Sequence, residues 1–142
     1  MPGRTYLAVN PPQITWDGTA LLDPRSFAIV RQIRSQFVGG RPGDAWDTTV
    51  EVNREGYEFA IVIGDEESAS SLLALPRSGL TDRTLICTTV GSHDEENIVY
   101  TLLNATITSF APIGSGYQEA RTFAFTGVAR SADGVTDPLA VA

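Results

Sequence analysis

The sequence predicts a mainly β fold, a β-sandwich or barrel of about seven or eight strands with one short α-helix at about residues 65–75. Most apolar runs are short and rich in β-branched and aromatic residues, which favours strands. Segments rich in Gly, Pro and Asp separate these runs, and only one run carries both start and stop signals of a helix. Because 142 residues is the length of one ordinary domain, we expect residues 1–142 to share a single core.

The first half of the chain contains five expected strands: Thr5–Val9, Gln13–Trp16, Ser26–Val38, Asp47–Val52 and Tyr57–Ile63. The run Ser26–Val38 also fits a helix face, but its β-branched and aromatic content favours a strand. Between the last two runs, "NREG" predicts a tight hairpin turn in which Gly56 is able to take a positive φ.

One helix is expected, within "GDEESASSLLALP". Asp65 is its predicted N-cap, and Glu66 and Glu67 lie in the first turn, where the helix dipole favours anions. A cluster of leucines follows, and Pro76 ends the helix.

Three strands are expected in the second half, at Arg83–Val90, Asn97–Phe110 and Arg121–Arg130. The middle one is long, and no charged side chain occurs between residues 97 and 118. Simple alternation places apolar residues on both of its faces, so neither face is clearly the solvated one. Residues 131–142 are small and polar, and we expect them to form a loose C-terminal arm.

Catalytic groups are scarce in this sequence. His93 is the only histidine and lies in the polar turn "GSHDEEN", and Cys87 is the only cysteine. They are too few for a zinc site, and no phosphate loop or nucleophile elbow is present. The acidic clusters 65–67 and 94–96 lack the spacing of a loop that wraps a cation. We therefore expect a protein that is not an enzyme and binds no metal or cofactor.

The charge of the chain excludes some partners. Its net charge is −7, and all 10 basic residues are Arg. Such a chain is not expected to grip nucleic acid, because that affinity comes from cationic contacts to phosphates. No run approaches the length of a membrane span, and "MPGRTYLAVN" lacks the features of a secretory signal. We expect a soluble chain assembled in a reducing compartment, with no membrane partner.

The long uncharged strand predicts assembly with other copies of the chain. A long strand without charges is an aggregation hazard unless something specific covers its edges and faces. Closed rings of identical subunits satisfy such surfaces, with neighbouring sheets joined into a larger barrel. The strand residues expected at this contact are Tyr100, Leu102, Ile107 and Phe110.

A glycine-rich loop at residues 39–46 is the second expected contact. Its sequence "GGRPGDAW" is incompatible with regular structure and predicts a mobile hairpin tip. Such a tip is suited to reach the next subunit or the next ring. The residues expected there are Gly39, Gly40, Arg41, Pro42, Gly43, Asp44 and Trp46.

The order of features from residue 44 to residue 125 resembles that of phage tail tube proteins. A strand pair and an acidic-capped helix, "GDAWDTTVEVNREGYEFAIVIGDEESASSLLAL", come first. "YTLLNATITSF", a loop and "TFAFTGVA" then resemble the closing hairpin of that family. The resemblance covers about 80 residues and is one of pattern and order.

This resemblance implies a helix-flanked β-barrel or sandwich that forms hexameric rings, which stack into a hollow tube for DNA ejection. The loop "VGGRPGDAW" would become ordered on polymerisation. The implied partners are other copies of the chain and other tail or baseplate proteins, while DNA passes through the lumen without specific binding. The implied location is the virion tail, assembled in the host cytoplasm.

Two other interpretations stay open at this point. One is another ring component of a virion: a distal tail, baseplate, tail terminator or capsid decoration protein. The other is a soluble jelly-roll binding module, in which Trp16, Trp46 and Tyr117 would line a ligand groove.

Overall fold

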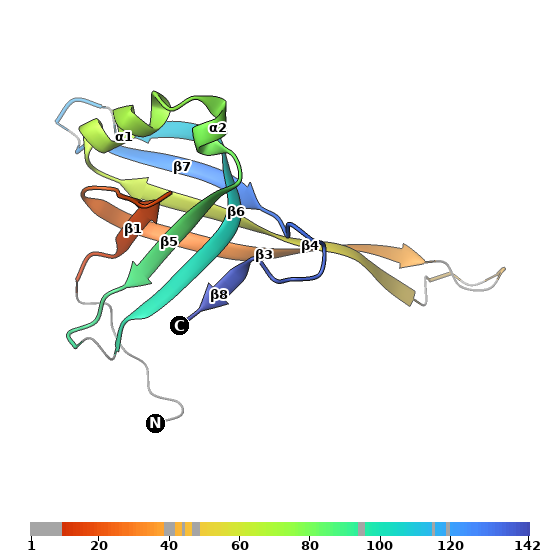
Figure 1. Ribbon diagram of the computed structural model, residues 1–142. Coiled ribbons are helices and arrows are strands. Elements are labelled where there is room, and N and C mark those ends of the chain that lie inside the picture. The colour runs from red at the N-terminus through yellow and green to blue at the C-terminus, as the bar shows by residue number, and fades with distance from the viewer. Residues whose placement is uncertain are drawn as a thin grey trace.

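A computed structural model gives the arrangement of the chain (Figure 1). It describes residues 10–38, 42–43, 45–46, 49–93, 96–114, 116–118 and 120–142. For residues 34–38 and 49–54 only the backbone is described. The expected strand Thr5–Val9 therefore lies outside the described residues.

The described part of the chain is mainly β, as predicted. Eight strands and two short helices follow in the order β1 (Gln13–Trp16), β2 (Thr19–Ala20), β3 (Pro24–Val38), β4 (Thr49–Ile63), α1 (Glu66–Leu73), α2 (Arg77–Leu80), β5 (Arg83–Thr89), β6 (Ile98–Ile113), β7 (Thr122–Ala129) and β8 (Leu139–Val141). The strands form one open antiparallel sheet in the order β2-β1-β5-β6-β7-β4-β3, and β8 pairs with β6. Neighbours in this order are hydrogen-bonded, so the sheet forms a continuous surface.

The sheet curls so that both of its ends pack on one core. Trp16 of β1 contacts Phe59 of β4, with ring centroids 6.2 Å apart, and Phe27 of β3 contacts Tyr100 of β6 at 5.7 Å. The largest side chains that are almost fully buried are Trp16, Phe125, Ile14, Ile61, Ile63, Leu85, Leu102 and Cys87. They come from five strands, so hydrophobic burial holds the curled sheet together.

The predicted helix is confirmed as α1, and it lies across one end of the core (Figure 1). The Asp65 side chain accepts a hydrogen bond of 2.9 Å from the backbone N–H of Ser68, as an N-cap does. Ala69 and Leu72 are its buried residues. A second helix, α2, was not predicted because its sequence "RSGL" is too short to show a period.

The predicted "NREG" turn is wrong. These residues lie inside β4, which is continuous and pairs with β3 along its whole length. The register passes from Arg34↔Arg54 to Ser35↔Val52, so Asn53 is the extra residue of a β-bulge. Gly56 lies opposite Gln32 within the ladder and is not one of the glycines with a positive φ. The turn-prone residues Asn53 and Gly56 therefore lie within a bulged strand and not in a turn.

The long uncharged strand is confirmed as β6, but its faces differ from simple alternation. Leu102 and Ala105 are both fully buried although they are three residues apart. Asn104 between them has a positive φ of 54°, and the pairing with β5 shifts at this point. A second shift follows between Ile107 and Ser109. Each irregularity moves the inward-facing positions by one residue, which removes the alternation from the sequence.

The C-terminal arm is more ordered than predicted. Residues 139–141 form β8 on the edge of β6, and the backbone of Ala142 exchanges hydrogen bonds of 2.9 and 3.0 Å with Val99. The Asp137 carboxylate accepts hydrogen bonds of 2.9 Å from the backbone N–H of Leu139 and the hydroxyl of Tyr57. These bonds fasten the arm to the core.

Acid is expected to loosen this arm. The bonds from the Leu139 amide and the Tyr57 hydroxyl lower the pKa of Asp137. Because the folded pKa lies below the unfolded value of about 3.9, the stabilisation is complete above about pH 4 and is lost as the pH falls through the folded pKa. Hydrogen exchange of the Ala142 amide, corrected for intrinsic rate, should accelerate below about pH 4. In Tyr57→Phe the exchange should be faster at neutral pH, and equal protection in both proteins at every pH would contradict this account.

Candidate assembly surfaces

The sheet has an outward face made almost entirely of small, uncharged side chains. It spans β3, β4, β7 and the second half of β6, on the side opposite to the core residues of these strands. Its members are cross-strand neighbours: Ser26, Ala28, Val30, Glu58, Ala60, Val62, Ala124, Thr126, Val128, Ser109 and Ala111. We call this set the small-residue face.

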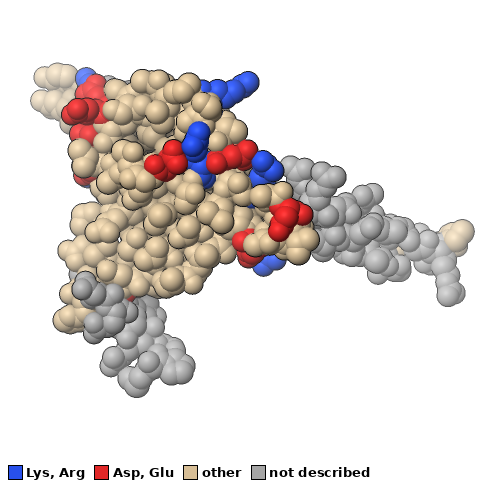
Figure 2. Space-filling view, viewed as in Figure 1, with Lys and Arg blue, Asp and Glu red and all other residues tan. Residues whose placement is uncertain are grey.

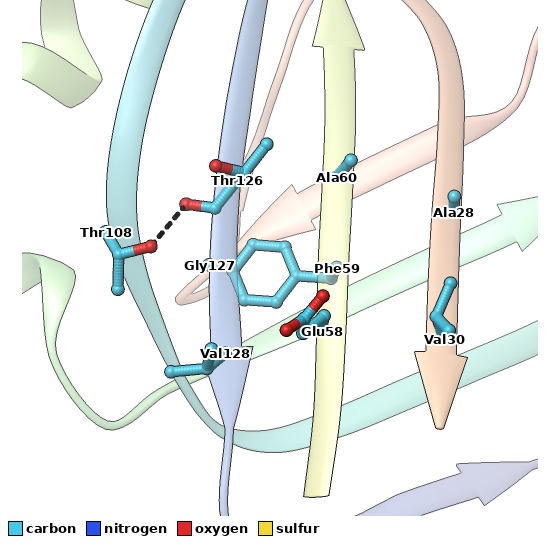
Figure 3. A pocket seen from close by; sticks show the side chains of 9 residues that line it. All are labelled: Ala28, Val30, Glu58, Phe59, Ala60, Thr108, Thr126, Gly127 and Val128. Atoms are coloured by element: carbon cyan, nitrogen blue, oxygen red, sulfur yellow. Dashed lines mark hydrogen bonds between the residues drawn. The ribbon is translucent and has the colours of Figure 1, made fainter. Parts of the chain in front are cut away.

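A shallow depression lies in the middle of the small-residue face (Figure 3). Its volume is about 350 Å³, and Ala28, Val30 and Ala60 line one side of it. On the other side the Thr108 hydroxyl donates a hydrogen bond of 3.3 Å to the Thr126 carbonyl. Glu58 is the only charged member of the face, and it accepts a hydrogen bond of 3.3 Å from Gln32. The surface offers little that would bind a charged polymer.

Strand β3 forms one end of the sheet. Within the described part of the chain its backbone pairs only with β4, so its other edge carries no ladder. It is 15 residues long, which makes it a long edge strand for a domain of this size. An edge of this kind is a template for pairing with another chain.

The second half of β3 and the first half of β4 extend beyond the rest of the sheet as a two-stranded projection (Figure 1). We call this projection, which is distinct from the C-terminal segment, the arm. Strand β7 pairs with β4 only over Tyr57–Ile63, so residues 49–56 of β4 have only β3 beside them. At the end of the arm, Gly43 has a φ of 95° and Trp46 is 85% exposed. The other predicted contact residues are Pro42, which lies in a turn, and Gly39, Gly40, Arg41 and Asp44, which lie outside the described residues.

The four strand residues predicted to contact another subunit lie on the core side of β6. Leu102 is fully buried, and Tyr100, Ile107 and Phe110 are partly buried against the core. Phe110 contacts Phe125 with ring centroids 4.9 Å apart. Their role between subunits stays a prediction, and the large apolar side chains that β6 exposes are instead Ile98, Leu103 and Ile113.

Most of the arginines whose side chains the structure describes are paired with carboxylates at the surface. Arg83 contacts Asp17 at 3.4 Å and Arg130 contacts Asp82 at 2.9 Å, and all four side chains are more than a third exposed. Figure 2 shows charged side chains near the helices and at the base of the arm. Most of the remaining described surface in this view is uncharged. Exposed pairs of this kind contribute little to stability.

The single histidine and the single cysteine lie in different environments. His93 is exposed, and its backbone carbonyl accepts a hydrogen bond from the backbone N–H of Glu96 in a turn. Cys87 is fully buried, and burial raises the pKa of its thiol to about 12, which suppresses the reactive thiolate. Among the described residues, no three His, Cys, Asp or Glu side chains lie close enough to hold a metal ion. No helix in the described part of the chain is long and apolar enough to cross a membrane.

The aromatic groove of the jelly-roll interpretation does not form. Trp16 is only 2% exposed, and its indole N–H donates a hydrogen bond of 3.0 Å to the Gly79 carbonyl. Trp46 lies at the end of the arm, while Tyr117 lies in the β6–β7 loop at the other end of the sheet (Figure 1). Of these three aromatic residues, Trp16 therefore belongs to the core, and Trp46 and Tyr117 are exposed at separate places.

Comparison with solved structures identifies the same fold in parts of contractile injection systems. One is in the sheath-tube complex of the extracellular contractile injection system PVC, with 10% identity over 99% of this chain and 93% of that chain, and a TM-score of 0.63. Another is the tube-terminating cap of the anti-feeding prophage, with 10% identity, 100% and 94% coverage and a TM-score of 0.63. A third is in the six-fold symmetrised baseplate of the anti-feeding prophage, with 8% identity, 98% and 97% coverage and a TM-score of 0.55.

No protein-family model matches the sequence, and no curated protein matches it. At identities near 10% the solved structures show a shared fold. The resemblance in fold to phage-tail-like tubes, expected from the order of strands and helix, is confirmed.

Proposed function

We propose that this protein is a structural subunit of a phage-tail-like tube, in which copies of the chain form rings that stack into a hollow conduit. The observation that carries the proposal is the small-residue face, which spans four strands and ends at the unpaired edge of β3. The fold shared with a sheath-tube complex supports the same role. The exposure of His93 and the full burial of Cys87 support a role without catalysis.

The geometry suggests how such a ring would close. The free edge of β3 adds a neighbouring subunit's strand, so that the sheets of several copies join into one barrel. The small-residue face then lines the channel, and α1 and α2 stay on the outer part of the wall. Because the contact is between different surfaces of each copy, it forms a ring when the rotation between neighbours closes. We propose six copies per ring, the symmetry of the anti-feeding prophage baseplate that shares the fold.

The channel lining fits passage without binding. A polymer such as DNA is held by cationic contacts to its phosphates, and Glu58 is the only charged member of the small-residue face. We propose DNA ejection from a virion tail as the function, with assembly in the host cytoplasm and with tail or baseplate proteins as partners. An injection apparatus that carries another cargo would use the same lining.

Glu58→Arg is expected to convert this channel into one that retains nucleic acid. Each ring would gain a girdle of positive charge, and binding through such contacts weakens steeply with salt. Tubes of the variant should retain a single-stranded oligonucleotide at about 50 mM salt and release it above about 200 mM. Tubes of the wild type and of the matched control Glu58→Gln should retain none. Equal retention by the Arg and Gln variants would show that this face does not line the channel.

The test of the proposed function is negative-stain electron microscopy with light scattering across a concentration series. Open-ended hollow tubes, or rings that stack, are the expected result. Successive backbone N–H groups of a strand point to opposite edges, so Val30→Pro and Arg31→Pro, both at exposed positions of β3, form a matched pair. The variant that removes an amide from the free edge of β3 should block ring formation in a chain that stays folded. A chain that stays monomeric under every condition would contradict the proposal.

A single ring at the end of a tube is the second candidate function. The cap of the anti-feeding prophage and the PVC sheath/tube terminator share the fold with the same TM-score, 0.63, as the sheath-tube complex. A cap, terminator or baseplate component would give closed rings that never stack. Microscopy therefore separates this candidate from the tube subunit.

A further inference from the structure

A preformed apolar groove lies at the helical end of the molecule. It has a volume of about 500 Å³ and runs between α1, α2 and the β1–β2 hairpin. Two hydrogen bonds fix its walls: the Leu22 amide donates to the Ser68 hydroxyl at 3.1 Å, and the Trp16 indole donates to the Gly79 carbonyl at 3.0 Å. The groove is therefore built before any partner arrives.

The lining of this groove is suited to an aromatic side chain with one polar atom. Leu22 and Leu75 expose their side chains there beside the buried Leu72, which gives an apolar floor. Asp65 and Glu67 lie on its rim and present carboxylate oxygens. An indole fills an apolar slot with its rings and finds an acceptor for its N–H at such a rim.

The chain carries an exposed indole at the end of the arm. Trp46 is 85% exposed, although a Trp side chain buries about 150–250 Å² when it is covered. The groove lies at the start of β3 and the end of β4, whereas Trp46 lies beyond their other ends. Along a strand of 15 residues the two are separated by about 50 Å. Trp46 therefore cannot reach the groove of its own chain.

We infer that Trp46 of one subunit inserts into the groove of a second copy of this chain in the next ring. The groove and the arm lie at opposite ends of the β3–β4 hairpin, so the contact is head-to-tail and repeats along a stack. One such contact buries too little area to hold two monomers together, because stable pairs bury about 1,200 Å² or more. Only a ring, which presents several arms at once, makes it effective. The inference rests on the proposed ring and names the contact that stacks it.

The test compares tube formation by three variants. Trp46→Ala removes the inserted side chain, and Leu22→Glu places a charge in the groove at an exposed position. Each should raise the protein concentration at which tubes appear by about thirtyfold or more while single rings still form. Tyr117→Ala is the matched control, since Tyr117 is 92% exposed and should leave this concentration unchanged.

Cross-linking then tests the partner directly. Ala45→Cys chains, which keep Trp46, mixed with Ser71→Cys chains, which keep Leu22 in the groove, should form a disulfide-linked pair on oxidation, and neither variant alone should form it beyond the wild-type level. Tubes of Trp46→Ala at the wild-type concentration, or no mixed disulfide, would overturn the inference and leave the ring proposal standing. A wild-type chain that forms no ring would overturn both.

Discussion

Gly127→Ala is expected to lower the free energy of unfolding by about 3 kcal/mol. Gly127 lies in β7 opposite Ile107. A Cβ at this position would overlap the carbonyl oxygen of Thr106 and lie 2.6 Å from Cζ of Phe59. Neither neighbour is able to move freely, because one is backbone and the other is a buried ring. The two strands therefore come this close only when residue 127 has no side chain.

Gly56→Ala is the matched control for this substitution. Gly56 also lies within a strand, but a Cβ there would meet only the carbonyl oxygen of Ala129, at an ordinary distance of 3.5 Å. Its effect should stay within about 1 kcal/mol. Urea unfolding followed by tryptophan fluorescence measures both variants. Equal midpoints for the two would show that the approach of β6 and β7 is not constrained at Gly127.

Phe125→Ala is expected to lower the free energy of unfolding by about 3–5 kcal/mol. The Phe125 side chain is 1% exposed and contacts Phe110, and Phe110 also stacks on Phe123 at 6.0 Å. Removing the ring leaves a cavity among side chains from three strands. Calorimetry or urea unfolding of the isolated chain measures the loss.

Phe110→Ala separates the two possible roles of the ring cluster. If Phe110 acts within its own chain, its loss should lower the stability of the monomer, and the double variant with Phe125→Ala should lose less than the sum of the single effects. Exposed Tyr117→Ala should change stability by less than about 0.5 kcal/mol. Full monomer stability of Phe110→Ala with loss of assembly would instead support the role first predicted for it.

Much of the fold followed from local patterns in the sequence. Three local patterns each allow a single physical interpretation: the acidic cap at Asp65, the alternation in Tyr57–Ile63 and the pair of phenylalanines in Thr122–Ala129. The structure contains the element that each pattern predicts. The failures within the long strands β4 and β6 share one cause. Asn53, Asn104 and the second register shift of β6 are irregularities within long strands, and turn-prone residues look the same in a bulge as in a turn.

The candidate site was harder to predict than the fold. Trp46 and its glycine-rich loop could be proposed as a contact from the sequence because loop composition is a local property, and their role stays a prediction. The small-residue face was missed although Ala28, Ala60 and Ala124 alternate with large residues in three strands. Its meaning depends on strand order, which places these segments side by side, and strand order is not visible in periodicity.

The continuous pairing of β3 with β4 has a mechanical consequence. The arm is not a loop attached to the sheet but the far end of strands that begin within the core, at Pro24 and Ile63. Backbone hydrogen bonds in an antiparallel ladder lie perpendicular to the strands. A pull along the arm therefore loads the whole ladder in shear, and many hydrogen bonds resist together where an unzipping force would break them one at a time. A tube built in this way would transmit axial force through its backbone from one ring into the core of the next.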